Sequence, residues 1–191
     1  MIYDLVKKNR TYRRFFQQEP VTQETLTELI ELARLSSCGA NMQSLKYILS
    51  WEPARNELIF PHLRWAGYLK EWHGPEEGEK PAAYVIMLGD KEISSNHFWD
   101  HGIASQSILL GAVEKGLGGC MFGSIDRQGL TRALAIPERY EILMVIALGK
   151  PKETVVIEEM ADPANVKYWR DGQGVHHVPK RRLEELIVTL D

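Results

Sequence analysis

Three arginines near the N-terminus form the first group of residues that could do chemistry. Arg10, Arg13 and Arg14 surround Thr11 and Tyr12 in the stretch NRTYRRFFQQEPV, just before the first strongly periodic segment. A guanidinium presents a fork of N–H donors that matches a phosphate, and a hydroxyl beside it can add another hydrogen bond. The stretch therefore predicts an anion site, although three arginines in isolation are equally typical of a solvated basic turn.

A second basic group lies near the C-terminus. In the stretch HHVPKRRL, the residues His177, Lys180 and Arg182 follow a turn signal. Positive charge in the first turn of a helix mildly opposes the helix dipole, so it is unhelpful there unless an anion is present. The stretch is interpreted either as part of a phosphate site or as a basic first turn of the last helix.

Two further stretches combine small residues with polar ones. Residues 36–47, SSCGANMQSLKY, carry one Asn and one Gln with almost no bulk around them, which indicates that something flat and polar lies against this backbone. Residues 116–124, GLGGCMFGS, follow a helix and lead into an extended run, the reverse of the strand-to-helix order of a dinucleotide fingerprint. These glycines instead indicate close approach of a flat ligand or another backbone, or a tight helix-to-strand connection.

Hydrophobic periodicity and end signals predict the elements that must position these stretches. The most regular is a helix over 22–35, with Thr22 as its N-cap. Further helices are expected over 63–72, 97–116, 126–134 and 180–190, strands over 45–51, 83–88 and 142–148, and a hairpin over 166–178. Helices and strands are intermixed without repeated βαβ units, so the order favours an α+β fold over a doubly wound sheet.

The expected helix over 97–116 is rich in small residues. Because they leave little bulk, another helix could approach this one closely, either in the core or across a subunit interface. The small residues are Gly102, Ala104, Ser105, Ser107, Gly111 and Ala112.

Composition bounds the class of protein. The 191 residues carry a formal net charge of -3 with 44% hydrophobic and 26% charged residues, the balance of an ordinary globular protein and not of a nucleic-acid binder. The length is expected to form a single domain, 1–191, with an excursion from the sheet at about 52–80. No segment approaches the roughly 20 apolar residues of a membrane span. Cys38 and Cys120 match no metal or CxxC spacing, so reduced thiols in a cytoplasmic protein are expected.

Taken together, these stretches resemble the FMN-dependent nitroreductase family. The matching order is R-T-x-R near the start, small residues with N-x-Q after the first long helix, GLGGCMFGS after a small-residue helix, the strand LMVIALGKP, and PKRRL near the end. The resemblance covers almost the whole chain. It implies an α+β homodimer whose central, mostly antiparallel sheet is flanked by helices, with two FMN molecules at the subunit interface and NADH or NADPH as electron donor.

The resemblance also implies roles for the basic and small-residue stretches. Arg10, Thr11 and Arg13 would bind the phosphate and the pyrimidine side of FMN, and Lys180 and Arg182 would complete the phosphate site. The segment within 36–47 would lie along the flavin held mainly by the other subunit. Its polar contacts and clearance would come from Ser37, Cys38, Gly39, Asn41 and Gln43.

Around the flavin ring, the resemblance implies that the backbone at Gly123 donates to N5, with Met121 and Phe122 packed nearby. The flavin carries the chemistry, so no nucleophilic side chain and no metal is expected. Hydride would pass from the nicotinamide through the flavin to a nitroaromatic, quinone or similar flat acceptor in a ping-pong mechanism. The expected walls of the substrate pocket, for which a core role is equally compatible, are Trp65, Tyr68, Leu69 and Trp72.

The sequence departs from the family pattern at two places. Many members carry a basic residue at the position of Asn9, which puts one phosphate contact in doubt, and the usual QPW is QSL at residues 43–45. The chain is also short for the family. Substrate choice is therefore poorly constrained by these motifs.

Other functions are compatible with parts of the pattern. Relatives of the same fold fragment flavin, remove halogen from aromatic substrates or oxidise ring intermediates, and a binding module could hold FMN without turnover. A thiol hydrolase would use Cys38 with His97 or His101 and Asp100, but it needs a histidine within hydrogen-bond reach of the thiol. The sequence alone shows no such contact.

Overall fold

The structure is a computed structural model in which residues 1–162 and 164–190 are described. Its helices are α1 (Ile2–Lys8), α2 (Gln23–Arg34), α3 (Pro53–Ile59), α4 (Asp100–Glu114) and α5 (Arg127–Ala133), with short 3-10 turns at Gly39–Asn41, Phe60–His62 and Leu183–Glu185. Its strands are β1 (Leu45–Ser50), β2 (Ala83–Asp90), β3 (Gly118–Phe122), β4 (Tyr140–Gly149), β5 (Val155–Glu159), β6 (Trp169–Arg170) and β7 (His176–Lys180).

The central sheet is antiparallel throughout, with the strand order β1-β2-β4-β3. Every residue of β2 is buried, and β2 pairs with β4 along its whole length. The prediction that the strands over 83–88 and 142–148 are the central ones is confirmed. The α+β class with a mostly antiparallel sheet flanked by helices is confirmed as well.

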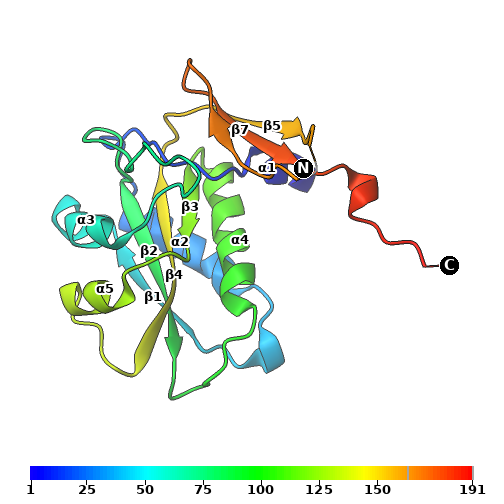
Figure 1. The fold of residues 1–191 in the computed structure, drawn as a ribbon. Coiled ribbons are helices and arrows are strands. Elements are labelled where there is room, and N and C mark those ends of the chain that lie inside the picture. The colour runs from blue at the N-terminus through cyan, green and yellow to red at the C-terminus, as the bar shows by residue number, and fades with distance from the viewer. Residues whose placement is uncertain (163, 191) are drawn as a thin grey trace.

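Helices cover both faces of this sheet and form two cores (Figure 1). On one face, α2 and α4 pack against side chains of β2 and β4 such as Val85 and Ile146. On the other face, α3 and α5 pack against the alternate residues, such as Ile86 and Val145. Because successive strand residues point to opposite faces, β2 and β4 supply both cores, which explains their continuous apolar runs.

The predicted helix ends agree with the structure. The Thr22 side chain accepts a hydrogen bond from the Thr25 amide at 3.1 Å, and Asp126 caps α5 by accepting from the Gly129 amide at 3.0 Å. Gly116 ends α4 with a φ of +73°, the left-handed conformation that glycine adopts at low cost. The predicted hairpin forms between β6 and β7, which pair antiparallel.

Most small residues of α4 serve the core. Ala104, Ser105 and Ala112 are buried, and a Cβ at Gly111 would lie 2.3 Å from Leu32 of α2. The small residues therefore allow the close packing of α2 on α4. Gly102 differs, because it is exposed and a Cβ there would meet nothing within 4 Å.

The N-terminal segment after α1 lies against the edge strand β3. Tyr12 donates its amide to the Gly119 carbonyl at 3.0 Å, and Thr11 forms a parallel bridge with Gly119. A Cβ at Gly118 would lie 2.4 Å from the Tyr12 ring. Of the interpretations offered for the glycines of 116–124, close approach of another backbone applies at Gly119, where a Cβ would lie 2.6 Å from the Ala147 carbonyl oxygen, whereas Gly118 leaves room for the Tyr12 ring.

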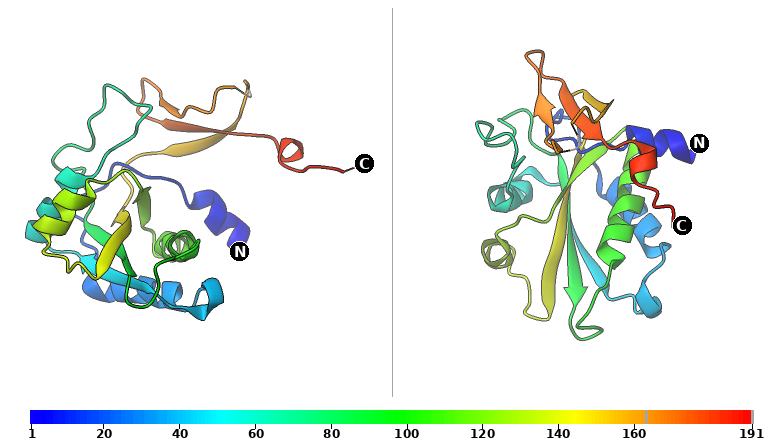
Figure 2. Two further views of the ribbon diagram at one scale, coloured as in Figure 1. Left: turned by 60° about the horizontal axis from the view of Figure 1, so that its bottom comes forward. Right: turned by 45° about the vertical axis from the view of Figure 1, so that its right-hand side comes forward.

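Two predicted helices are wrong. Residues 63–72 form turns, because Leu63 pairs with Ile125 and the Arg64 amide donates to the Ser124 carbonyl, which hold the chain extended where the helix should begin. Residues 180–190 contain only the turn Leu183–Glu185 within an arm that projects from the body (Figure 2). Its apolar residues find no surface of this chain to cover, and so short a helix is marginal without packing. In addition, α1 forms over residues 2–8, where no helix was expected.

No helix within residues 1–162 and 164–190 is long and apolar enough to cross a membrane.

An ion pair fastens the segment between β1 and β2 to the N-terminal segment. Arg14 donates to both carboxylate oxygens of Glu79 at 2.5 and 2.6 Å, and Lys152 lies 3.0 Å from the same group. These hydrogen bonds, with Arg14 first, lower the pKa of the Glu79 carboxyl to about 2 against partial burial. The pair is only partly exposed, so solvent screens it weakly.

We expect Glu79→Gln to lose a pH-dependent part of the free energy of unfolding. Because the folded-state pKa of Glu79 is lowered, its contribution is present above its ordinary pKa of 4.5 and disappears as the pH falls toward about 2. The wild type should exceed the variant by roughly 3 kcal/mol near pH 7, and the difference should shrink below pH 5. Urea unfolding at several pH values measures this. Glu19→Gln, at an exposed ion pair with Lys150, is the control, and a pH-independent difference for Glu79→Gln would contradict the assignment.

Candidate functional site

A cavity of about 270 Å³ brings together the two ends of the chain, α4 and β3. The N-terminal segment contributes one wall, and β7 contributes the opposite wall. Three of the five stretches, namely the arginine stretch, residues 116–124 and the basic C-terminal stretch, thus meet at one place. The lining residues are Asn9, Arg10, Thr11, Arg13, Gln106, Leu109, Gly119, Met121, Tyr168, His176, Val178 and Lys180.

Arg13 is the most constrained of these residues. It is 8% exposed, yet among the described residues its guanidinium has no carboxylate partner. Its Nη1 atom lies 3.2 Å from Nε2 of His176, and its Cζ atom lies 4.6 Å from the centre of the Tyr168 ring. A buried cation without a counterion is costly, so this geometry indicates that an anion completes the site.

The one buried carboxylate nearby, Glu153, is engaged elsewhere. It accepts the backbone amides of Arg13 and Arg14, the latter at 3.2 Å, and the Nη2 atom of Arg170 at 2.9 Å. Glu153 therefore fixes the backbone of the arginine stretch and leaves the Arg13 side chain free. Glu153 therefore does not neutralise the Arg13 guanidinium, because its hydrogen bonds go to two backbone amides and to Arg170.

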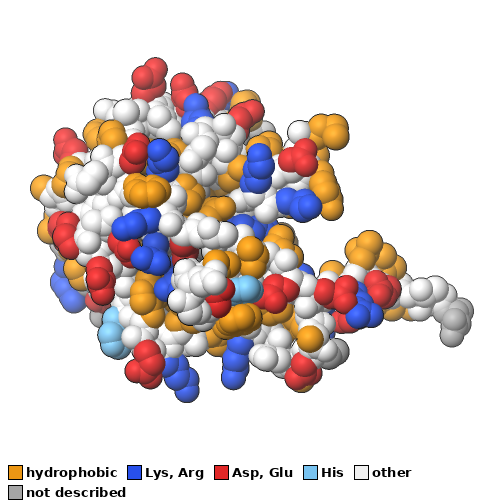
Figure 3. Space-filling model, turned by 90° about the horizontal axis from the view of Figure 1, so that it is seen from above, with side chains coloured by type: hydrophobic (Ala, Val, Ile, Leu, Met, Phe, Trp, Pro, Cys, Tyr) orange, Lys and Arg blue, Asp and Glu red, His pale blue; other side chains and the backbone are white. Residues whose placement is uncertain are grey.

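Arg10 and Lys180 add two further cations to the same cavity. Arg10 donates from Nη2 to the Val6 carbonyl at 2.9 Å, while its buried Nε atom has no partner among the described residues. Burial lowers the pKa of the Arg10 guanidinium. No Asp or Glu belongs to the described lining. From above, the molecule shows a notch between α1 and the C-terminal segment, with basic side chains at its inner end (Figure 3).

The stretch 36–47 lines a second cavity, of about 280 Å³, beside the N-terminal half of α4. The backbone there is unusual, because Ala40, Asn41 and Gln43 have positive φ values of 48°, 54° and 52°. Non-glycine residues rarely adopt this conformation, and clusters of them occur at ligand sites. Of the predicted contact residues, the lining includes Ser37, Cys38, Asn41 and Gln43.

A buried carboxylate holds this loop in place. Asp100, 3% exposed at the start of α4, accepts the Gly39 amide at 2.8 Å, and its other oxygen has no partner among the described residues. Burial, followed by the charges of Asp100 and Cys38, raises the pKa of Tyr47 to about 12. A Cβ at Gly39 would lie 2.7 Å from the Phe98 ring, so this position requires glycine for clearance.

The residues predicted to lie near the flavin ring separate onto two faces of β3. Met121 is 43% exposed and lines the basic cavity, and at Gly123 a Cβ would meet open space. Phe122 points to the opposite face and is buried against Trp65, with ring centres 4.6 Å apart. Strand alternation therefore brings Met121 to the cavity and places Phe122 in the core.

The four aromatic and apolar residues predicted to wall a substrate pocket also separate. Trp65, Leu69 and Trp72 line a different cavity of about 310 Å³, on the outer side of the Phe122 core. Tyr68 instead packs on Tyr168, with ring centres 5.0 Å apart. None of the four belongs to the described lining of the basic cavity, and Tyr68 is the one that packs on a lining residue, Tyr168.

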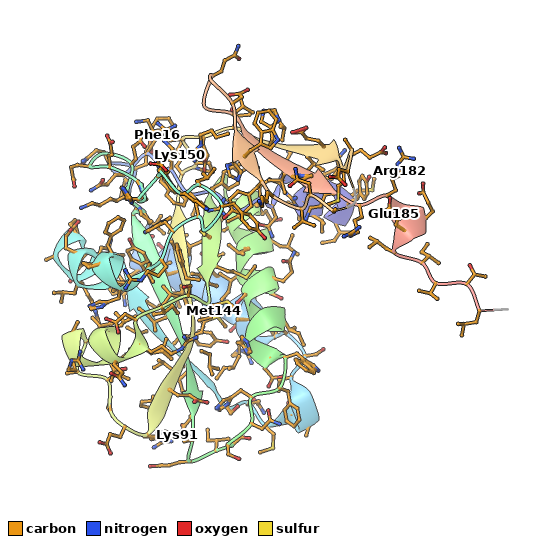
Figure 4. All side chains as sticks on the ribbon, in the orientation of Figure 1. Phe16, Lys91, Met144, Lys150, Arg182 and Glu185 are labelled. Atoms are coloured by element: carbon orange, nitrogen blue, oxygen red, sulfur yellow. The ribbon has the colours of Figure 1, made fainter. Side chains whose placement is uncertain are left out.

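The predicted basic C-terminal residues divide in the same way. Lys180 lines the cavity, whereas Arg182 pairs with Glu159 at 2.6 Å and lies out on the arm (Figure 4). His177 points away from the cavity, toward Asp171 and Glu158, and its ring stacks on Trp169. The histidine that lines the cavity is instead His176, which sequence reasoning missed together with Tyr168 and Gln106.

A signal for His176 was present in the sequence. Once HHVPK is taken as a strand with Lys180 facing the site, the period of two also brings His176 and Val178 to that face. The cavity lining contains these three residues of β7. No comparable signal marks Tyr168, because its position depends on how the hairpin folds over Arg13.

The alternative of a thiol hydrolase finds no support in these contacts. Cys38 contacts Asn41 at 3.9 Å, and within the described part of the chain no histidine is hydrogen-bonded to it. His97 is engaged by Ser44 at 2.8 Å and Glu141 at 3.1 Å. Burial raises the pKa of the other thiol, Cys120, to about 12, so it is held neutral. The described residues also contain no group of three or more potential metal ligands.

We expect inorganic phosphate to raise the melting temperature of the wild type, because a ligand that binds only the folded state stabilises it. At ten times the Kd, the rise should be roughly 4 °C relative to chloride at matched ionic strength. Arg10→Ala should lose most of this rise, because its unpartnered Nε atom is a donor that the phosphate can use. Lys91→Ala, an exposed cation at the far end of the sheet (Figure 4), should keep it. An equal rise in Arg10→Ala would show that this guanidinium does not face the anion.

Comparisons with known proteins show which family this chain belongs to. The model of the Nitroreductase family matches residues 6–150. MhqN of Bacillus subtilis, a protein named as an NAD(P)H nitroreductase, is 23% identical over 189 residues, covering 78% of this chain and 87% of its own length. The iodotyrosine deiodinase of Thermotoga neapolitana is 23% identical over 169 residues, covering 80% of this chain and 90% of that protein.

Solved structures show the same fold. An FMN-dependent nitroreductase of Clostridium difficile superposes with a TM-score of 0.61 at 21% identity, covering 86% of this chain and 92% of that chain. At such identity the superposition shows the fold alone. Since the family match extends over most of the chain, however, this protein belongs to the nitroreductase family and is an oxidoreductase of that family.

Proposed function

We propose that this protein uses FMN to transfer hydride from NADH or NADPH to a small flat acceptor, such as a nitroaromatic or a quinone. The observation that carries the proposal is the cavity in which Arg10, Arg13 and Lys180 meet without a described carboxylate partner. FMN would satisfy these cations, because its phosphate is close to dianionic at neutral pH and its pyrimidine edge gains negative charge on reduction. The relatives named for NAD(P)H and FMN support the choice of cofactors.

The residues of the cavity fit the two ends of FMN. Arg10, Thr11 and Lys180 would hold the phosphate, with the unpartnered Nε atom of Arg10 available as a donor. Arg13, deeper in the cavity, would face the pyrimidine edge. Its positive charge would stabilise the negative charge that this edge carries after reduction. Arg182, paired with Glu159, would contribute to the phosphate site only if it exchanged that partner.

Bound FMN would supply the hydride acceptor and donor at N5, so the chain needs no nucleophile of its own. The chain's part is to bind, orient and exclude water. Gly123 leaves open space where the ring must approach the backbone, and Met121 offers a flexible apolar contact beside it. Tyr68, which rests on Tyr168, is the best placed of the predicted walls to contact an acceptor.

A homodimer is part of the proposal. The two cavities border successive parts of α4, the second one its N-terminal part at Asp100 and Ala104 and the basic one its middle at Gln106 and Leu109. Pairing through α4 would bring the second cavity of one subunit toward the basic cavity of the other. Ser37, Cys38, Gly39, Asn41 and Gln43 would then contact the FMN held by the partner.

Exposed apolar surface supports this pairing. Trp99 and Ile103 of the α4 region are 80% and 40% exposed, and the arm exposes Leu186, Val188 and Leu190 by 64%, 82% and 87%. Pairing through α4 would cover the exposed side chains of Trp99 and Ile103. We further propose that residues 1–191 act as one domain. We also propose a cytoplasmic location, because the free cysteines Cys38 and Cys120 fit a reducing compartment.

The deiodinase relative favours a second candidate, reductive removal of halogen from an aromatic ring. It is as similar to this chain as the nitroreductase relative, and the same FMN site would serve. The two activities differ in the acceptor alone. Turnover with a halogenated phenol but not with a quinone would favour the second candidate.

An absorbance spectrum tests the proposed function. We expect the purified protein, or the protein incubated with FMN and desalted, to show flavin bands between about 300 and 600 nm. Anaerobic NADH or NADPH should bleach the bands, and a quinone should restore them. Retained flavin that neither nucleotide bleaches would indicate a binding module, and a protein that stays colourless would overturn the assignment of FMN.

We expect Ile103→Glu to weaken dimerisation, because it places a charge on the exposed face of α4. Sedimentation velocity should show a shift toward monomer over a range of concentrations, with FMN binding reduced in parallel. Ile157→Glu is the control, since Ile157 is 43% exposed on β5, away from α4. A dimer that is equally stable in both variants would place the interface elsewhere.

A further inference from the structure

We propose that His176 is a positioning residue, which as a neutral hydrogen-bond acceptor holds the Arg13 guanidinium toward the cavity, with Tyr168 supporting it from the side. The proposal rests on the proposed function, because it assigns the pair to the pyrimidine edge of the flavin that FMN would bring. It gives a role to His176, which begins the basic C-terminal stretch but was not among the predicted binding residues. It also explains why Arg13 stays unneutralised.

The geometry fixes the chemical state of His176. The residue is 1% exposed, and its Nε2 atom lies 3.2 Å from Nη1 of Arg13. A guanidinium has only donors, so Nε2 must accept and the ring must carry its proton on Nδ1. The Nδ1 atom is buried without a partner in the described part of the chain. The contact with Arg13 is therefore the one described hydrogen bond that selects this tautomer.

Tyr168 limits the remaining freedom of Arg13. The guanidinium carbon lies 4.6 Å from the centre of the Tyr168 ring, which offers a cation–π contact. The same ring lies 5.1 Å from the His176 ring and 5.0 Å from Tyr68. Arg13 is thus held by one aromatic face and one neutral acceptor, and neither cancels its charge.

The charges around His176 keep it neutral. Arg13 faces it from the N-terminal segment, Arg170 from β6, and His177 from its own strand, while Glu153 accepts from Arg170. Burial first, and these positive groups next, lower the pKa of His176 to about 4. Lys180 and Arg10 line the same cavity. Protonation would add a cation beside Arg13 and remove its acceptor, so near neutral pH the site should not respond to this group.

A neutral acceptor suits this position better than a carboxylate would. A carboxylate at position 176 would orient Arg13 equally well, but it would neutralise the guanidinium and compete with the incoming anion. Histidine with a lowered pKa provides direction without charge. The charge of residue 176 and its ability to accept a hydrogen bond should therefore have separable effects on the affinity for FMN.

Three variants at position 176 separate them. His176→Gln keeps a neutral acceptor, His176→Phe keeps a ring without one, and His176→Glu adds a carboxylate. We expect the Kd for FMN, measured by fluorescence titration, to stay within about 3-fold for Gln, to rise about 10-fold for Phe and to rise further for Glu. Equal affinity for the wild type and Phe, or equal loss for Gln and Phe, would overturn the proposal.

A double-variant cycle separates positioning from a general loss of structure. In an Arg13→Ala background, His176→Phe should cause no further loss of FMN affinity, because the group that it positions is absent. Tyr168→Phe should bind FMN like the wild type, and Tyr168→Leu should bind more weakly. Additive losses from His176→Phe and Arg13→Ala would contradict the proposed coupling.

A measurement on the protein without FMN distinguishes failure of this inference from failure of the proposed function. Long-range ¹H–¹⁵N spectra should show His176 neutral with its proton on Nδ1 between about pH 6 and 8. That result in a protein that binds phosphate but not FMN would reject the flavin and keep the positioning role. A proton on Nε2, or titration at the ordinary pKa of 6.5, would overturn the role whether or not FMN binds.

Discussion

The buried, unneutralised guanidinium of Arg13 is the interaction on which the site depends. A cation at 8% exposure must be compensated, and the structure gives its side chain a histidine nitrogen and an aromatic face instead of a carboxylate. Glu153, the nearby carboxylate, binds the backbone of the same stretch and Arg170. The protein thus fixes where the positive charge lies without cancelling it, which is the condition for binding an anion strongly.

The antiparallel sheet supplies the rigid base for this arrangement. Its two central strands feed both cores, and the edge strand β3 carries the N-terminal segment through the bridge between Thr11 and Gly119. Gly118 permits this contact because a side chain there would collide with the Tyr12 ring. Gly119 permits the pairing of β3 with β4, because a side chain there would collide with the β4 backbone. The arginine stretch is therefore held by backbone contacts, and the side chains of Arg10 and Arg13 remain available for a ligand.

Much of the fold could be predicted from the sequence, because strong local signals agree with the tertiary contacts. Thr22, Asp126 and Gly116 cap or end helices as their types predict, and the apolar strands are central. The helices expected over 63–72 and 180–190 failed for a common reason. In residues 63–72, helical propensity was opposed by long-range pairing of Leu63 with Ile125, which follows β3. In residues 180–190, the apolar side chains lacked a packing partner within the described chain, and so short a helix is marginal without one.

The sequence by itself determined which residues could bind an anion, since Arg10, Arg13 and Lys180 are marked by type and order. Only the tertiary structure decided which of them share a cavity, that Arg182 pairs with Glu159 instead, and that Phe122 belongs to the core. It also brought in His176, 163 positions from Arg13 along the chain. The physical reason is that type and periodicity are local properties, whereas the partner of a buried charge is set by contacts between distant segments.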